Sequence, residues 1–383
     1  MELGNRESGN LGMKESSANT LFHLLRAGLG NEAAGSELPS DINWQEVIDL
    51  SFEQNVAAIA VDGLDKIRSS IDNDNIEWKE KFELLNSEDM ENLKYMWFAE
   101  FIRCKEKYKE YKSKISGFIK LCKPHKVLLL KGYGLSLNYP IPSHRPCGDI
   151  DVFLFGEGES INQIVEKQLD ISIDRSNPHH SVFACGGFTF ENHNTILDVK
   201  RHKNQCSDEQ MFQELITEGC DEVEVGGERC FIPSVKMNSV YLLRHMAHHF
   251  AVERITLRHI LDWALFVKAN ASKIDWDFVY GFAKDSGCTP FLNCLNGICV
   301  ESLGFAAEDF PVRMRDGKLQ SRMLADILSP EFKEEIPDST HTLRYAIAKT
   351  RRILANRWKY RMVSDERIGV TIWNLAKERL KCK

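Results

Sequence analysis

The pattern of hydrophobic and polar positions divides the chain into a helical beginning, a middle of short strands and a helical end. Near residue 20, the run LFHLLRAGLG has helical apolar spacing and stops at a glycine. Between Trp78 and Leu121, apolar residues recur at steps of three and four among many charges. Both patterns predict amphipathic helices that precede the strands.

The middle of the chain, between about residues 117 and 233, changes to short apolar runs separated by Gly, Pro, Asn and Asp. One helix is predicted there, near residues 160–169. The predicted strands are VLLL (127–130), DIDVFLF (149–155), SVFACGGFTF (181–190), TILDVK (195–200) and the hairpin EVEVGGERCFI (222–232).

Helical periodicity returns after Pro233 and continues through residues 239–268, 275–303 and 343–381. The whole pattern predicts an α+β fold in which a small mixed sheet is flanked by an N-terminal and a C-terminal helical region. The expected division is a disordered tail (1–17), an N-terminal helical region (18–112), an α/β core (113–235) and a C-terminal helical region (236–383).

The composition is that of an ordinary soluble globular protein, with 43% hydrophobic and 27% charged residues in 383. No apolar run approaches the roughly 20 residues of a membrane span, and the polar first residues do not resemble a secretory signal. The 11 cysteines contain no CxxC pair, which favours free thiols over a disulfide or zinc role. We therefore expect a cytoplasmic protein.

The charge is unevenly distributed. Residues 341–383 contain twelve Lys and Arg against three Asp and Glu, or +9, so the other 340 residues must carry −16 to give the total of −7. The basic segment KTRRILANRWKYR also contains Trp358 and Tyr360. It would suit nucleic acid or anionic lipid, but a helix that packs on an acidic body is the preferred interpretation.

The strongest chemical signal lies in residues 127–155, VLLLKGYGLSLNYPIPSHRPCGDIDVFLF. Because alternate side chains of a strand share a face, Asp149 and Asp151 should lie on one face and Ile150 and Val152 on the other. Two neighbouring carboxylates repel each other unless one takes a proton or a cation binds. Oxygen ligands at this spacing suit Mg²⁺ or Mn²⁺.

A third acid, Asp198, lies in the run TILDVK. If that run formed a strand beside the strand of Asp149 and Asp151, the three acids could hold two metal ions that bridge nucleotide phosphates and an attacking oxygen.

At these residues the chain resembles the polymerase-β-type nucleotidyltransferase superfamily, through LLKG, R-x-x-G-D-I-D and a later strand with one acid. More narrowly, it is similar to a bacterial family of uncharacterised nucleotidyltransferases, over about residues 20–265. The resemblance implies metal binding and catalysis by Asp149, Asp151 and Asp198, and a nucleotide framed by further residues. Those are Lys131, Gly132, Arg145 and Gly148.

One position departs from the superfamily pattern. Tyr133 follows Gly132, where the superfamily has Gly-Ser or Gly-Gly, so a serine hydroxyl for the triphosphate is missing. Lys131 or Arg145 would have to substitute for it.

Several other residues are secondary candidates. His179 and His180 could position an acceptor or relay a proton, or could simply belong to a turn. Arg258 and Asp262 have the spacing of a helix-surface ion pair, and the resemblance implies that they face the site. The helical histidines of RHMAHHF (244–250) have the spacing of a zinc pair, but their preferred interpretation is as core-edge residues.

The sequence thus predicts a metal-dependent transfer of a nucleoside monophosphate from an NTP, with ATP favoured, to a hydroxyl or phosphate acceptor. The acceptor could be a small molecule, a protein or RNA. Two alternatives stay open. One is a nucleotide-binding module without turnover, and the other is an RNA-binding scaffold that uses the basic segment.

Overall fold

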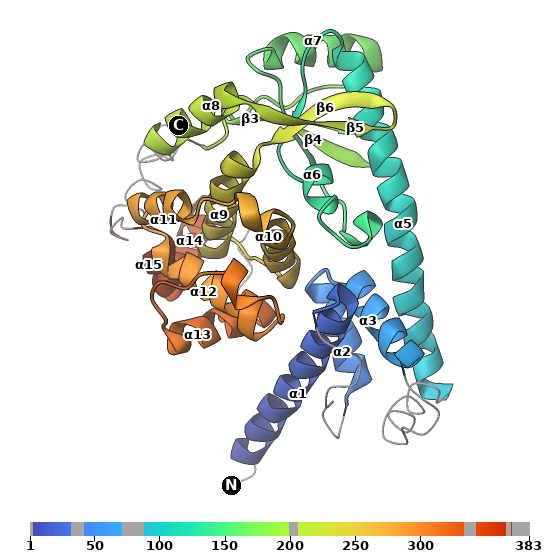
Figure 1. Cartoon of the computed structure of the whole chain (residues 1–383), viewed down its shortest axis with the longest axis vertical. Coiled ribbons are helices and arrows are strands. Elements are labelled where there is room, and N and C mark those ends of the chain that lie inside the picture. Colours follow the sequence, from blue (N-terminus) through green and yellow to red (C-terminus); the bar gives the residue numbers. More distant parts are fainter. Residues whose placement is uncertain are drawn as a thin grey trace.

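The computed structural model describes residues 3–31, 42–70, 88–198, 206–332, 342–364 and 369. It confirms the α+β class: one mixed six-stranded sheet, with strand order β3-β4-β2-β1-β6-β5, is preceded and followed in the chain by helical regions, which lie largely below the sheet in Figure 1. The strands are β1 (Leu128–Leu129), β2 (Ile150–Phe153), β3 (His180–Cys185), β4 (Phe188–His193), β5 (Cys220–Val225) and β6 (Glu228–Pro233).

Helices both precede and follow the sheet. The first region contains α1 (Leu3–Leu29), α2 (Trp44–Glu53), α3 (Ala57–Ser70) and the 35-residue α5 (Glu88–Cys122), which runs from the first helices to the sheet in Figure 1. The core adds α6 (Tyr133–Ser136), α7 (Gly158–Leu169) and α8 (Cys206–Glu218). The last region contains α9 (Val235–Val252), α10 (Leu257–Asn270), α11 (Trp276–Asp285), α12 (Thr289–Glu301), α13 (Gly317–Leu328), α14 (Thr342–Ala355) and α15 (Arg357–Val363).

Strand alternation separates two hydrophobic cores. Leu129 of β1 and Val152 of β2 point into the core that α5 and α7 cover. Leu128 and Phe153 point to the opposite face, into the core shared with α9 and α10. Because the carboxylate of Asp151 shares a face with Phe153, the acids lie on the side of the C-terminal helices.

The two helical regions pack against each other as well as against the sheet. Residues from α1 to α3 and from α9 to α13 belong to one continuous core. Polar contacts join the same elements, since Arg26 Nη1 donates to the Ser302 carbonyl at 3.1 Å and Gln54 Nε2 donates to the Ile327 carbonyl at 3.1 Å. The sheet therefore rests on a common helical base made from both ends of the chain.

The predicted strand SVFACGGFTF is in fact a hairpin. Gly186 and Gly187 both have positive φ, 57° and 82°, and join β3 to β4. A two-residue turn of this kind matches the twist of an antiparallel pair and needs glycine or a similar residue at both positions. The consequence is a second strand, β4, that continues to His193 and pairs in parallel with β2.

One other prediction was wrong. Residues 195–197 of the predicted strand TILDVK form bends after the end of β4, residue 198 has no regular structure, and these residues do not extend the sheet. α1 begins at Leu3, within the range predicted as a tail, and the predicted division of the chain into regions stays a prediction. Extending a helix costs less than starting one, so the packed turns of α1 can propagate toward the N-terminus. Asn43 caps α2, and its side chain accepts from the Glu46 backbone N–H.

Candidate active site

The two acids of the D-x-D pattern lie at the start of β2, beside β4. Asp151 is the register partner of Glu191 on the parallel strand β4, and Asp149 comes two residues earlier. Side chains of register partners in neighbouring strands lie on the same face. The sheet therefore places Glu191 with the two predicted acids, on the face that the C-terminal helices approach.

Asp151 is buried and has two nitrogen partners, Lys131 and His193. Its Oδ1 lies 2.8 Å from Lys131 Nζ and 3.2 Å from His193 Nε2. Burial would raise the pKa of this carboxyl, but Lys131 and His193 outweigh burial and hold the pKa well below its usual range. Burial would likewise lower the pKa of Lys131, but the charge of Asp151 raises it. Lys131 thus neutralises part of the acidic charge for which the sequence analysis predicted a metal ion.

Asp149 has the opposite electrostatic situation. Its side chain is exposed, and partial burial together with the charges of Glu191 and Asp151 raises its pKa. A hydrogen bond from Thr189 and the more distant Lys131 offset only part of that increase. The surroundings of Asp149 therefore disfavour its negative charge. A cation bound at this face would reduce the repulsion among the three carboxylates.

Glu191 and His193 are functional candidates that the sequence analysis missed. Together with Asp151 they form a group whose possible ligand atoms lie within 4.8 Å of one another. His193 Nε2 also lies 3.6 Å from Glu191 Oε2. Recognising Gly186-Gly187 as a hairpin turn would have revealed them, because the alternation F-T-F-E-N-H then predicts a second strand with Glu191 and His193 on one face.

Asp198 comes directly after the bends that follow β4 and is half-buried. Its charge is near enough to His180 to act on the pKa of that imidazole. Among the described residues, the groups with metal-ligand spacing contain neither Asp198 nor Asp149. Metal binding by these two acids stays a prediction.

Lys131 and Gly132 form the turn that follows β1. Gly132 has a φ of 62°, and a Cβ at this position would lie 2.1 Å from the Tyr111 hydroxyl. Both the backbone conformation and the contact require glycine. By contrast, a Cβ on the exposed Gly148 would meet no atom of the described structure within 4 Å. The fold itself therefore explains the glycine at position 132. At position 148, beside Asp149, the described structure leaves room for a larger side chain.

Tyr133, the residue that departs from the superfamily pattern, faces the opposite core. Its ring is buried among residues of α5, and its hydroxyl donates to the Glu224 carbonyl at 2.9 Å. The tyrosine therefore ties α6 to the β5–β6 hairpin. It offers no replacement for a serine hydroxyl on a phosphate.

Arg145 is buried in an ionic cluster with α10. Its Nε and Nη2 donate to Asp262 Oδ1 and Oδ2 at 2.8 and 3.0 Å. Tyr139 and Arg258 donate to the same carboxylate at 2.8 and 3.1 Å. Arg258 and Asp262 do form an ion pair, but Asp262 is buried and the pair is not on the helix surface. Their predicted position facing the site stays a prediction. The bidentate pair fixes the loop that leads to Asp149 against α10, and a direct contact of Arg145 with nucleotide stays a prediction.

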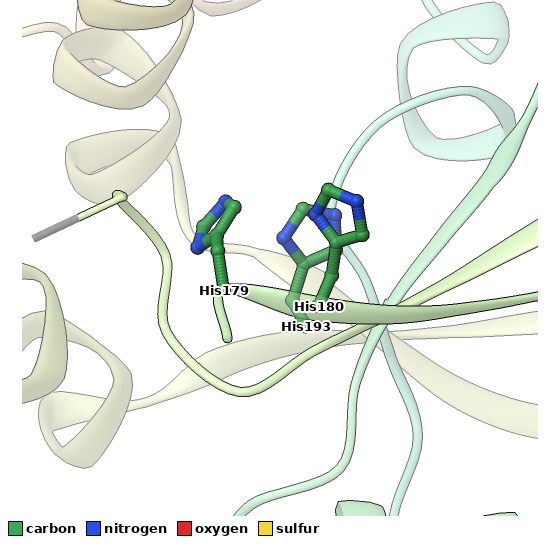
Figure 2. Close-up of side chains that lie close together, drawn as sticks. All are labelled: His179, His180 and His193. Carbon is green, nitrogen blue, oxygen red and sulfur yellow. The ribbon is translucent and has the colours of Figure 1, made fainter. Parts of the chain in front are cut away.

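The two histidine groups lie on different elements. His179 and His180 are at the start of β3, beside His193 at the end of β4 (Figure 2). His245 lies on α9, and its pKa is well below the usual value, first because of burial and second because of the charge of Lys131. The helical histidines of α9 therefore approach the site from the C-terminal side.

The basic C-terminal segment is a packed helix over its described residues. Trp358 and Met362 of α15 are buried in the larger core. Lys359 forms a buried ion pair with Asp326 of α13, with 2.5 Å between Nζ and Oδ2. The described part of the segment thus follows the preferred interpretation from the sequence.

The ten cysteines within the described ranges are free thiols. Over the same ranges, every helix is too short or too polar to cross a lipid bilayer.

Comparison with known proteins identifies one family. Residues 40–304, more than half of the chain, match the model of a family described as uncharacterised nucleotidyltransferase. No match was found among curated proteins. No match was found among solved structures either.

Proposed function

The chain belongs to the family of uncharacterised nucleotidyltransferases, and from that premise we propose that it transfers a nucleoside monophosphate from an NTP to a hydroxyl or phosphate acceptor. The observation that carries this proposal is the acidic face of the sheet. Asp151 lies beside Glu191 in the register of two parallel strands, and Asp149 lies directly before β2. Acids held on a rigid sheet are suited to binding a cation together with a polyphosphate.

The residues present fit a divalent metal such as Mg²⁺ or Mn²⁺. Carboxylate oxygens are the ligands that these ions prefer, and the raised pKa of Asp149, due first to burial and then to Glu191 and Asp151, indicates a face in need of positive charge. Asp149, Asp151 and Glu191 would hold the metal, with Asp198 as a further candidate. When bound, the metal would neutralise triphosphate charge that develops during transfer.

We assign Lys131 to the triphosphate. Its Nζ is 2.8 Å from Asp151 Oδ1, so the ammonium already lies at the acidic face. A cation that reached the same carboxylate would free the lysine to donate to a phosphate oxygen. Arg145 would contribute by fixing the loop before Asp149 on α10, through its two bonds to Asp262.

A nucleotide-binding module without turnover is the second candidate, favoured by one observation. The pair between Lys131 and Asp151 partly neutralises the acidic face within the protein itself. The two candidates are separated by incubating the purified chain with each labelled NTP, Mg²⁺ or Mn²⁺, and a cell extract. A labelled acceptor together with released pyrophosphate supports transfer, whereas binding without product supports the module.

Lys131→Ala should weaken binding of an NTP by about tenfold to a hundredfold, because a charge-assisted hydrogen bond contributes about 1.5–3 kcal/mol. Binding of the corresponding nucleoside should change much less, since it has no phosphate. Titration calorimetry below the melting temperature measures both. The exposed Lys126, before β1, provides the matched control Lys126→Ala, which should change neither affinity. Equal losses for NTP and nucleoside would contradict the role of Lys131.

Gly148→Ala should leave the free energy of unfolding within about 0.5 kcal/mol of the wild type, because its Cβ would meet no atom within 4 Å. If Gly148 frames the nucleotide, the same change should weaken NTP binding. Gly132→Ala is the comparison, and it should destabilise the protein by about 2 kcal/mol or more through its positive φ and the Tyr111 contact. Thermal unfolding with and without Mg²⁺-NTP checks both variants. Unchanged NTP affinity in Gly148→Ala would remove that residue from the site.

A further inference from the structure

Three imidazoles meet at one end of the β3–β4 hairpin, beside the acidic face. His180 and His193 are register partners on the two strands, and His179 comes directly before β3. Figure 2 shows the three side chains on the same side of the hairpin with their rings gathered together. Their possible ligand nitrogens lie within 4.8 Å of one another.

The ring spacing suits a tetrahedral metal ion. The ring centres are 4.9 Å apart for His179 and His193, 5.2 Å for His179 and His180, and 5.4 Å for His180 and His193. Zinc–nitrogen bonds of about 2.0–2.1 Å put a ring centre roughly 3 Å from the ion, so tetrahedral ligands have centres about 5 Å apart. Small side-chain adjustments would therefore bring all three rings onto one ion.

Two buried nitrogens in this group lack a partner. Within the described residues, Nδ1 of His180 and Nδ1 of His193 are buried and make no hydrogen bond. His193 as a whole is only 6% exposed. A buried polar atom without a partner costs about 1–3 kcal/mol, so such atoms commonly indicate a ligand. A metal ion bound by both nitrogens would remove that cost.

The neighbours of His193 and His179 set the tautomers that coordination needs. His193 Nε2 donates to Asp151 Oδ1 at 3.2 Å, which leaves the lone pair on Nδ1. Thr195 donates its hydroxyl to the Leu197 carbonyl at 2.7 Å and thus accepts from His179 Nδ1 at 2.8 Å, which leaves the lone pair on Nε2. Carboxylates and other polar groups orient metal-binding histidines in this way.

Within the described part of the chain, the His180 ring makes one long polar contact, which coordination would displace. Asn177 Nδ2 lies 3.4 Å from His180 Nε2, near the limit of a hydrogen bond. Binding through Nδ1 of His180 would put the proton on Nε2 and end that contact. The charges of Glu191, Asp151 and Asp198 all act on His180, so a dication would enter a negative field.

We propose that His179, His180 and His193 form a second metal site, selective for Zn²⁺ or a similar transition-metal ion over Mg²⁺. Imidazole nitrogens favour zinc, whereas Mg²⁺ requires oxygen ligands in octahedral geometry. Three protein nitrogens leave the fourth tetrahedral position for water or a substrate oxygen. His193 connects this ion to the acidic face, because its other nitrogen is hydrogen-bonded to Asp151.

The test is metal binding by the full chain without nucleotide. After removal of metals, the wild type should take up one Zn²⁺ per chain and retain it through gel filtration in excess Mg²⁺. Co²⁺ in its place should give the intense visible absorption of a four-coordinate ion. His180→Ala should weaken Zn²⁺ binding by roughly a hundredfold or more, since even the partners that orient a ligand contribute 10–100-fold.

Two variants serve as controls. His125→Ala removes an imidazole that belongs to neither group of metal-ligand spacing among the described residues, and should bind Zn²⁺ like the wild type. Asp149→Asn should lose Mg²⁺-nucleotide binding but retain Zn²⁺, which separates failure of this site from failure of the proposed function. If His180→Ala does not fold, His179→Gln takes its place. Zn²⁺ that Mg²⁺ displaces, an octahedral Co²⁺ spectrum, or unchanged affinity in the folded histidine variant would overturn the proposal.

Discussion

Asp151→Asn is expected to abolish the stabilisation that Mg²⁺-NTP gives the wild type, and to destabilise the protein even without ligand. In the wild type, a ligand at a hundredfold excess over its Kd should add about 2.7 kcal/mol to the free energy of unfolding. The variant should show no such gain, because asparagine keeps the shape of the side chain but removes the charge that binds the metal. Thermal unfolding with and without Mg²⁺-NTP measures both effects.

The loss of stability without ligand follows from Lys131. Its ammonium lies 2.8 Å from Asp151, and the side chains are only 19% and 7% exposed. Breaking a buried ion pair by removing one partner costs about 3 kcal/mol or more. From the sequence alone, repulsion between the two acids predicts that their asparagine variants are as stable as the wild type or slightly more so. The contact with Lys131 reverses that expectation for Asp151.

Asp149→Asn is the matched comparison. Asp149 is largely exposed, and its pKa is raised first by partial burial and then by the charges of Glu191 and Asp151. Removing its charge should therefore leave the free energy of unfolding unchanged or slightly higher. It should still abolish the gain from Mg²⁺-NTP. If either variant keeps the full gain and still transfers label, the acidic face is not the nucleotide site.

The dependence on pH provides an independent check of the Asp151 variant. The pKa of Asp151 is lower in the folded protein than in the unfolded chain, where an aspartate has a pKa of about 3.9. Its stabilising contribution is therefore complete above that value and is lost as the pH falls further. The difference in stability between wild type and Asp151→Asn should thus shrink in acid. A constant difference from neutral pH to pH values well below 4 would contradict the ion pair as its cause.

Asp262→Ala is expected to destabilise the protein by about 3–5 kcal/mol, the typical result of leaving buried charges without a partner. The Asp262 carboxylate is 5% exposed and accepts from Arg145, Arg258 and Tyr139. Without this carboxylate, the guanidinium groups of Arg145 and Arg258 both lose their ionic partner. Urea unfolding measures the effect, and a change within about 1 kcal/mol would show that the cluster contributes little.

A double variant, Arg145→Met with Asp262→Leu, separates the two roles of Arg145. Replacing both partners of a buried pair by apolar residues should recover much of the stability that Asp262→Ala loses. If Arg145 only fixes the loop before Asp149, the double variant should also keep most of its NTP affinity. A recovery of stability with a loss of NTP affinity well beyond tenfold would instead show direct contact with the nucleotide. Asp326→Ala, at the buried pair with Lys359, controls for general destabilisation.

Local sequence pattern was enough to predict the fold class and the first two acids of the candidate site. Apolar periods of 3.6 and 2 separate the helices from the strands, and period-2 alternation puts Asp149 and Asp151 on one face. The helix of residues 158–169 and the hairpin of β5 and β6 also follow from local pattern. These features depend on neighbours in the chain, which is why a single sequence reveals them.

Which residues join those acids depends on the tertiary structure. Glu191 and His193 reach Asp151 because β4 pairs in parallel with β2, a contact across about 40 residues of sequence that no local pattern encodes. Tertiary packing also brings Arg145 into contact with Asp262, which is 117 residues away, and Lys131 into contact with Asp151. The partners that influence the ionisation of Asp151, Lys131 and Arg145 are therefore brought together by strand order and helix packing. Local sequence pattern determines only which helices and strands form.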